Sequence, residues 1–88
     1  MEIFQLRYFI MVVKFGNFTK AAKELHITQP ALSKQIKCLE EETKVKLLKR
    51  TKRGVEITEE GKQLKKHADN ILIEVEKINH AIHSKQTI

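Results

Sequence analysis

Hydrophobic residues recur with helical spacing along most of the chain, and the pattern predicts four helices. The first is expected over residues 4–15 and the second over 18–25. In both, apolar residues follow the i, i+3, i+4, i+7 spacing that places them on one face of a helix. These positions are Leu6, Phe9, Ile10 and Val13 in the first helix, and Phe18, Ala21, Ala22 and Leu25 in the second.

A turn of only three residues, 26–28, separates the second helix from a third, which is expected over 29–42. Thr28 is a good N-cap because its hydroxyl can accept a free backbone N–H, and Pro30 suits a first helical turn, where no amide donor is needed. His26 suits the turn because histidine tolerates the left-handed conformation that one turn residue often adopts. The inner stripe of the third helix is Leu32, Ile36 and Leu39.

Between residues 44 and 58 the pattern changes to two short β-type runs, 45–49 and 55–58. Residues 52–54 lie between them as a turn. The sequence therefore predicts a small β-hairpin, a wing, directly after the third helix.

A long final helix is expected over 59–83, capped by Thr58. Its apolar residues are spaced 4, 3, 4, 3, 4, a heptad-like seam. At 1.5 Å per residue the helix is roughly 35–40 Å long. Most of the seam therefore cannot pack on the residues that precede the helix, 1–58, which we call the head. We expect an identical helix to cover it in a homodimer, and the alternative is an intramolecular neighbour outside this chain. The predicted dimerisation residues are Leu64, Ala68, Ile71, Val75, Ile78 and Ile82.

Together these elements predict a mainly α fold. Residues 1–58 would form a winged helix-turn-helix of three helices and a β-hairpin wing, and residues 59–88 a linker (dimerisation) helix and tail. The alanine pair in the second helix supports this interpretation, because small side chains let the third helix cross closely.

The outward face of the third helix carries side chains suited to reading DNA. On a 100° helical wheel five of its residues fall within an arc of about 140°. Glutamine and serine can read base edges, proline offers apolar contact to a thymine methyl, and lysine meets phosphate or guanine. The alternative is an ordinary solvated face, but its position on the second helix of such a motif favours the major groove of DNA. The five residues are Gln29, Pro30, Ser33, Lys34 and Lys37.

The predicted wing is strongly basic. From Thr43 to Val55 it has six basic residues and no acidic one. Arg53, beside Gly54, would lie at the wing tip, where an arginine can enter a narrow minor groove. A charged edge also protects a sheet from aggregation, and both explanations can hold together. The basic residues are Lys44, Lys46, Lys49, Arg50, Lys52 and Arg53.

Composition agrees with a polyanionic partner without proving it. The chain of 88 residues has 17 Lys and Arg against 11 Asp and Glu, a formal charge of +6, and a pI near 9.6. A surface made soluble by lysines would give the same balance.

Other functional classes find little support. No nucleophile triad, phosphate-binding glycine loop or pair of carboxylates stands out, so we expect no enzyme, no catalytic residue and no cofactor. His80 and His83 share a helix face but have no further ligand at suitable spacing, so we expect no metal. Cys38 is the only cysteine and is interpreted as a packing residue. With no membrane-length apolar run and no signal-peptide layout, we expect a cytoplasmic protein.

The helix-turn-helix and wing segments resemble the LysR-type transcriptional regulators of bacteria. The resemblance rests on residues 17–42, NFTKAAKELHITQPALSKQIKCLEEE, and 47–61, LLKRTKRGVEITEEG. The Ala-Ala pair, the Thr-Gln-Pro-Ala-Leu-Ser segment and the Arg-Gly wing occur together at the family's spacing. Leu48 stands where many members carry phenylalanine, a conservative packing change.

The resemblance implies a sequence-specific DNA-binding domain whose linker helices pair antiparallel in a dimer. It implies base contacts in the major groove from Gln29, Pro30 and Ser33, and a base or phosphate contact from Lys34. Thr28 and Arg50 would hold the DNA backbone, and Arg53 would reach the minor groove. Family members bind interrupted palindromes and often form tetramers at full length. They continue into an α/β domain that binds a small-molecule effector, and no such domain is present in these 88 residues.

Two other functions compete with a sequence-specific regulator. A nonspecific architectural protein would show a large salt slope and little sequence discrimination, and the polar arc on the third helix argues against it. A winged helix used for protein–protein contact would carry a large apolar patch on the third helix, and the sequence shows none there.

Overall fold

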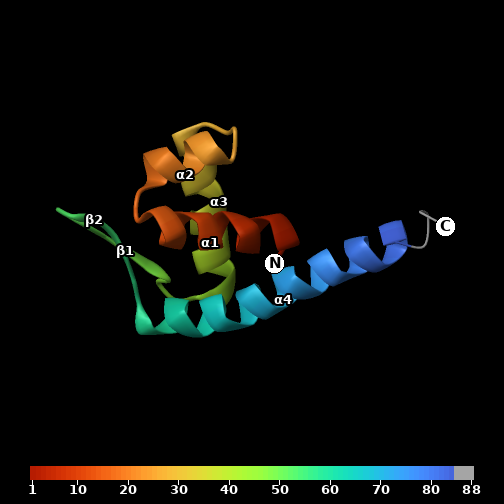
Figure 1. Cartoon of the computed structure of the whole chain (residues 1–88). Coiled ribbons are helices and arrows are strands. Elements are labelled where there is room, and N and C mark those ends of the chain that lie inside the picture. Colours follow the sequence, from red (N-terminus) through yellow and green to blue (C-terminus); the bar gives the residue numbers. More distant parts are fainter. Residues whose placement is uncertain (85–88) are drawn as a thin grey trace.

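The computed structural model describes residues 1–84, in which four helices and one two-stranded antiparallel sheet follow one another along the chain (Figure 1). The mainly α, winged helix-turn-helix prediction is confirmed, and each helix boundary lies within one residue of its predicted place. The predicted tail, residues 85–88, lies outside the described residues. The elements are α1 (Ile3–Phe15), α2 (Phe18–Glu24), α3 (Gln29–Thr43), β1 (Leu48–Thr51), β2 (Gly54–Ile57) and α4 (Glu59–Ser84).

The cap that the sequence predicts at the start of α3 is present, and a glycine caps the end of α1. Gly16 ends α1 in the left-handed conformation, with φ 61°, and its N–H donates to the Val12 carbonyl at 2.8 Å. The Thr28 hydroxyl accepts the Ala31 N–H at 3.2 Å and so begins α3. His26 adopts φ 58° in the turn, as expected. These local interactions fix where α2 ends and α3 begins, and so set their crossing.

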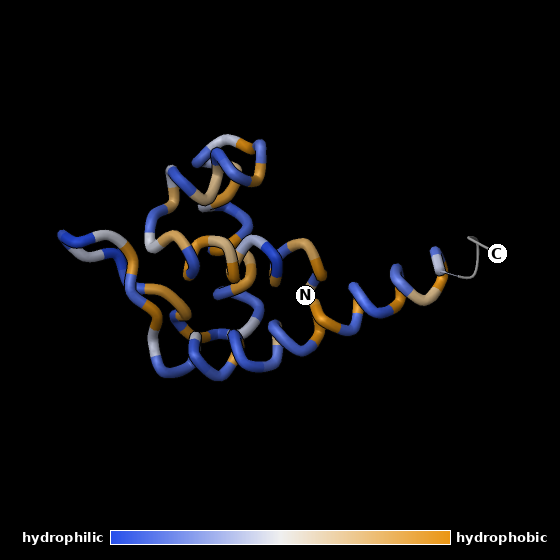
Figure 2. The backbone as a smooth tube through the Cα atoms, in the orientation of Figure 1, coloured by the Kyte–Doolittle hydropathy of each residue, from blue (hydrophilic) through white to orange (hydrophobic). Residues whose placement is uncertain are grey.

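The core lies where α1 meets the other helices. Its largest fully buried side chains are Phe9, Val12, Leu32, Leu39 and Leu47. The alanine pair of α2 is buried, at 0% and 3% exposure, and lets α2 approach α3 closely. Figure 2 shows hydrophobic residues concentrated in α1, whereas along α4 they alternate with hydrophilic ones. The head thus holds α3 with one stripe buried and the opposite face outward.

The wing is present, but β1 begins three residues later than predicted and β2 begins one residue earlier. β1 starts at Leu48 rather than at residue 45, the turn is Lys52–Arg53, and Gly54 pairs with Thr51 in the ladder. The prediction was wrong here because the carboxylate of Glu40, on α3, accepts the N–H groups of Leu47 at 2.8 Å and Leu48 at 3.2 Å. These hydrogen bonds hold the segment between α3 and β1 against α3, so its pairing with β2 begins only at Leu48.

The first part of α4 packs on the head, and the rest extends beyond it (Figure 1). Ala68 is completely buried within the chain, and Leu64 packs partly buried against the core. This corrects the predicted dimer seam: Ala68 has no surface left for a second chain, because α1 already covers it. The seam available to a partner therefore begins beyond Ala68.

Candidate nucleic-acid interface

The polar arc of α3 faces away from the core. Thr28, Pro30, Lys34 and Lys37 are exposed, while Gln29 and Ser33 are half-buried. The buried stripe of α3 is Leu32, Ile36 and Leu39. Pro30, Lys34 and Lys37 point away from this stripe, whereas Gln29 and Ser33 lie along its border. The start of α3 protrudes with α2 above α1 (Figure 1), which leaves this face free to meet another surface.

Arg50 brings the wing directly beside this face. Its Nη2 donates a hydrogen bond to the Ser33 hydroxyl at 2.9 Å. The guanidinium carbon also lies 4.1 Å from the centre of the Phe18 ring, at the start of α2. One side chain thus joins β1, α2 and α3. The family resemblance implies for Arg50 only a contact with the DNA backbone, and no local pattern in the sequence predicts its contacts with Ser33 and Phe18.

Gln29 joins the same group of side chains. Its Nε2 donates to the Ser33 hydroxyl at 3.0 Å, one helical turn away. The Ser33 oxygen therefore accepts two hydrogen bonds, one along α3 and one from the wing. Two of the predicted base-reading residues are thereby held in a fixed relation before any ligand arrives.

Two shallow hollows flank the Arg50–Ser33 contact. One, of about 500 Å³, lies between α3 and β1 and includes Lys37, Lys46 and Lys49 in its walls. The other, of about 240 Å³, lies between the start of α2 and the wing, and is lined partly by Thr19, Gln29 and Thr51. Donor groups and positive charge thus continue on both sides of the reading face.

The wing tip projects away from the helices (Figure 1) and carries Lys52 and Arg53, both exposed. The Thr51 hydroxyl shapes the turn, because it accepts the Arg53 N–H at 3.2 Å and donates to the Gly54 carbonyl at 3.4 Å. The turn therefore presents two cations on a backbone held by its own hydrogen bonds.

Most cations of this surface are not neutralised inside the molecule. Within residues 1–84 there are five ion pairs, and only one involves a basic residue of the wing, Lys46 with Glu40 at 3.9 Å. The reading face and wing tip consequently keep their positive charge for an external anion. The unpaired cations are Lys34, Lys37, Lys49, Arg50, Lys52 and Arg53.

Glu40 supports the site, although the sequence predicts no role for it. Its side chain is only 13% exposed, and it anchors two amides at the entry to the wing. The sequence signal was weak: a single acidic residue between the polar arc and the basic run.

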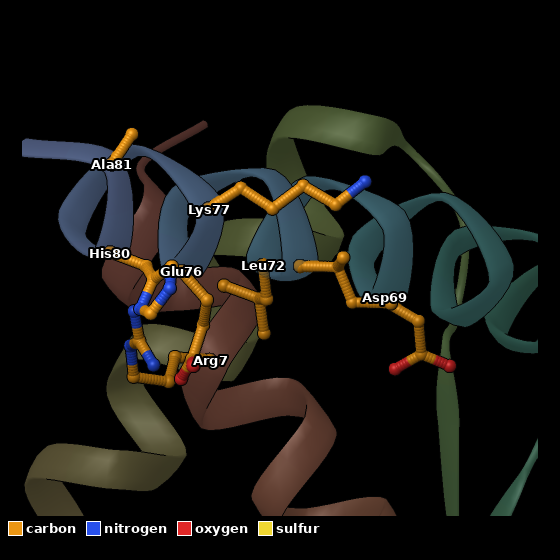
Figure 3. A pocket seen from close by; sticks show the side chains of 8 residues that line it. Arg7, Asp69, Leu72, Glu76, Lys77, His80 and Ala81 are labelled. Carbon is orange, nitrogen blue, oxygen red and sulfur yellow. The ribbon is translucent and has the colours of Figure 1, made fainter. Parts of the chain in front are cut away.

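The far half of α4 exposes apolar residues of the predicted seam. Ile71, Ile78 and Ile82 are 39%, 56% and 52% exposed, and Val75 is half-buried. A separate open hollow of about 820 Å³ lies between α1 and α4, where the side chains of Arg7, Glu76 and His80 converge (Figure 3). The seam and this hollow lie on different faces of α4.

No helix between residues 1 and 84 has the length and apolar character needed to cross a membrane. That stretch also brings no three His, Cys, Asp or Glu side chains together in a way that would hold a metal ion.

The geometry defines a class of protein: a winged helix-turn-helix with an outward polar helix, a basic wing and a long trailing helix. The model of the bacterial regulatory helix-turn-helix proteins of the lysR family matches residues 3–62. The chain therefore belongs to the LysR family and forms its helix-turn-helix DNA-binding domain.

Individual relatives agree with this assignment. Over 84 residues the chain is 48% identical to the nitrogen assimilation regulatory protein nac of Escherichia coli (strain K12), covering 96% of this chain and 28% of that protein. It is 51% identical over 75 residues to the transcriptional regulator AlsR of Bacillus subtilis (strain 168), covering 85% of this chain and 25% of that protein. The chain thus spans about a quarter of the length of these curated relatives, which are named as regulators.

Solved structures share the fold closely. The BenM_DBD/catB site 1 DNA complex superposes with a TM-score of 0.91 at 43% identity, covering 96% of this chain and 94% of that one. The LysR family transcriptional regulator CbnR superposes with a TM-score of 0.89 at 38% identity, covering 96% of this chain and 29% of that one.

Proposed function

We propose that this chain recognises a specific sequence in double-stranded DNA as the DNA-binding part of a bacterial transcriptional regulator. One observation carries the proposal: the polar face of α3 is outward, and the unpaired cations of the wing lie beside it through the Arg50–Ser33 bond. In this arrangement α3 enters the major groove and the wing reaches the adjacent minor groove. The solved DNA complexes of similar chains support it.

Each side chain of the proposed interface has a definite chemical role. Gln29, Pro30 and Ser33 contact base edges, and Lys34 contacts a base or a phosphate. Thr28 holds the DNA backbone: its oxygen accepts the Ala31 N–H, and its hydrogen is left to donate to a phosphate. The remaining cations act on the backbone and the minor groove. Of these, Lys37 and Arg50 meet phosphates, and Lys52 and Arg53 enter or border the minor groove.

The assembly that suits this role is a homodimer through α4. Ile71, Val75, Ile78 and Ile82 form an apolar stripe beyond the head, and a second copy of α4 offers the same stripe in return. An antiparallel pair would set two heads apart, which matches an interrupted palindrome in the DNA. In a full-length parent we expect a cytoplasmic protein, further assembly to a tetramer, and a small-molecule effector bound by a domain outside this chain.

A binding titration at near-physiological salt tests the proposed function. The chain is titrated with a duplex from upstream of its own gene cluster and with a scrambled duplex of equal composition. We expect clear preference for the upstream duplex. If all duplexes, including any selected from a random library, bind equally with a steep salt dependence, the chain is architectural and the proposal fails. Absence of DNA binding would favour the protein-contact alternative.

A further inference from the structure

The hydroxyl of Ser33 has both of its acceptor positions occupied inside the protein. A serine hydroxyl offers one hydrogen to donate and two lone pairs to accept. Gln29 Nε2 donates to one lone pair at 3.0 Å, and Arg50 Nη2 donates to the other at 2.9 Å. Among the described residues, no hydrogen bond uses the hydrogen of Ser33. The group that faces outward is therefore a donor alone.

Arg50 is held in this position by more than one contact. Its guanidinium lies 4.1 Å from the centre of the Phe18 ring, a cation–π distance. The ring itself is nearly buried, at 7% exposure, and belongs to the core. Residue 50 also pairs with Val55 in the wing ladder, which fixes its backbone. Phe18 thus holds the guanidinium of Arg50, and the pairing with β2 holds its backbone.

We infer that Arg50, seated on Phe18, is a positioning residue that makes Ser33 a hydrogen donor only and so sets which bases α3 accepts. The inference rests on the proposed function, since it concerns how α3 reads bases. Guanine, adenine and thymine each present an acceptor in the major groove, whereas cytosine presents only its N4 donor. The base that faces Ser33 must then be other than cytosine. Arg50 imposes this rule without contacting the base itself.

The test measures affinity for duplexes that differ at a single base pair. A bound duplex is first selected from a random library with the 88-residue chain, and all four base pairs are then placed at each position. The position at which Ser33→Ala abolishes the base preference is the one that Ser33 faces. There we expect the wild-type chain to bind cytosine on the contacted strand at least about five-fold more weakly than the other three bases.

Arg50→Met frees one acceptor of Ser33, and the cytosine penalty is expected to fall to within about two-fold. The lost charge lowers the affinity for all four duplexes by a further common factor, which does not affect the change in the cytosine penalty. Lys49→Met is the matched control: it removes one exposed wing cation that has no bond to α3. It should lower affinity uniformly and leave the cytosine penalty intact.

Phe18→Leu keeps every charge but removes the ring under Arg50, so the cytosine penalty should fall with the salt slope unchanged. Phe18→Tyr keeps the ring and should restore the penalty. Because Phe18 is a core residue, thermal unfolding of both variants is recorded, and if Phe18→Leu does not fold, the comparison of Arg50→Met with Lys49→Met decides.

Three results have distinct meanings. An unchanged cytosine penalty in Arg50→Met overturns the inference and leaves sequence-specific binding standing. A wild-type preference for cytosine also overturns it, because Ser33 would then accept from the base and spend its hydrogen on Gln29. If the library yields no preferred duplex, the proposed function itself fails.

Discussion

Gly54, in the wing, lies against the backbone of Gly16, the residue that ends α1. A β-carbon on Gly54 would stand 2.5 Å from the Gly16 carbonyl oxygen, and that oxygen also accepts the Val55 N–H at 3.1 Å. Gly54 has φ 126°, a conformation that residues with a side chain rarely adopt. The wing is therefore fixed to the end of the first helix by two glycines 38 positions apart.

Gly54→Ala should lower the free energy of unfolding by roughly 2–4 kcal/mol, because it adds backbone strain to a clash that neither backbone can relieve. Urea unfolding measures the loss. Gly16→Asn is the control, since Gly16 has φ 61°, which asparagine tolerates, and a β-carbon there would make only an ordinary contact, 3.9 Å from the Val55 carbonyl oxygen. It should cost less than about 1 kcal/mol. Equal effects of the two substitutions would show that the close approach is not a constraint.

Gly61→Ala is expected to destabilise the protein even though alanine is the better helix former. Helix propensity alone favours alanine over glycine by about 1 kcal/mol. A β-carbon at Gly61, however, would overlap the Leu47 carbonyl oxygen and lie 2.7 Å from Ile57 Cγ1. We expect a net loss of about 1–3 kcal/mol in thermal unfolding. Asn70→Ala, at an exposed position on the same helix, should be neutral or slightly stabilising, and a stabilised Gly61→Ala would contradict the packing described.

Gln29→Ala should weaken binding to the preferred duplex by about 1–3 kcal/mol and leave binding to a scrambled duplex almost unchanged. Glutamine carries no charge, so its loss removes a base contact without altering the attraction to phosphates. Fluorescence anisotropy on both duplexes gives the comparison. Arg53→Met provides the contrast, because loss of a cation should weaken both duplexes and reduce the salt slope. Equal losses on both duplexes for Gln29→Ala would argue against base reading.

Ile71→Lys should break the proposed dimer, because it places a charge in the apolar stripe that α4 offers to a second copy. Sedimentation equilibrium of the chain distinguishes a monomer from a dimer. Ile73→Lys is the matched control: it is also an exposed isoleucine of α4, at 52%, but lies about 200° from Ile71 around the helix. The dimer should survive Ile73→Lys, and if only this control dissociates it, the stripe is on the wrong face.

Local signals in the chain were strong enough to predict the helices and their ends. Each of these signals involves residues no more than four positions apart. They are the N-caps Thr28 and Thr58, and the left-handed backbone conformations of Gly16 and His26. Interactions of such short range depend little on the rest of the fold, so sequence spacing predicts them well. The apolar stripe of α3 likewise implied that its polar face points outward.

The start of β1 and the extent of the dimer seam were predicted wrongly for the same reason: both depend on contacts with another element of the fold. β1 begins only at Leu48 because the carboxylate of Glu40 accepts the N–H groups of Leu47, seven residues later, and Leu48, eight residues later. Ala68 is buried because α4 passes across α1, more than fifty residues away in the sequence. The heptad-like spacing is the same whether a residue faces α1 or a second copy, so periodicity alone cannot separate the two.

The winged helix-turn-helix, the outward polar face of α3 and the basic character of the wing follow from the sequence, because periodicity, caps and charge depend on neighbouring residues. Three features are evident only in the folded chain: Arg50 lies on Phe18 and bonds to Ser33, Gly54 and Gly61 must remain small, and α4 leaves the head beyond Ala68. Those features depend on backbones brought together by the packing of the core, and no local pattern encodes the distance between them.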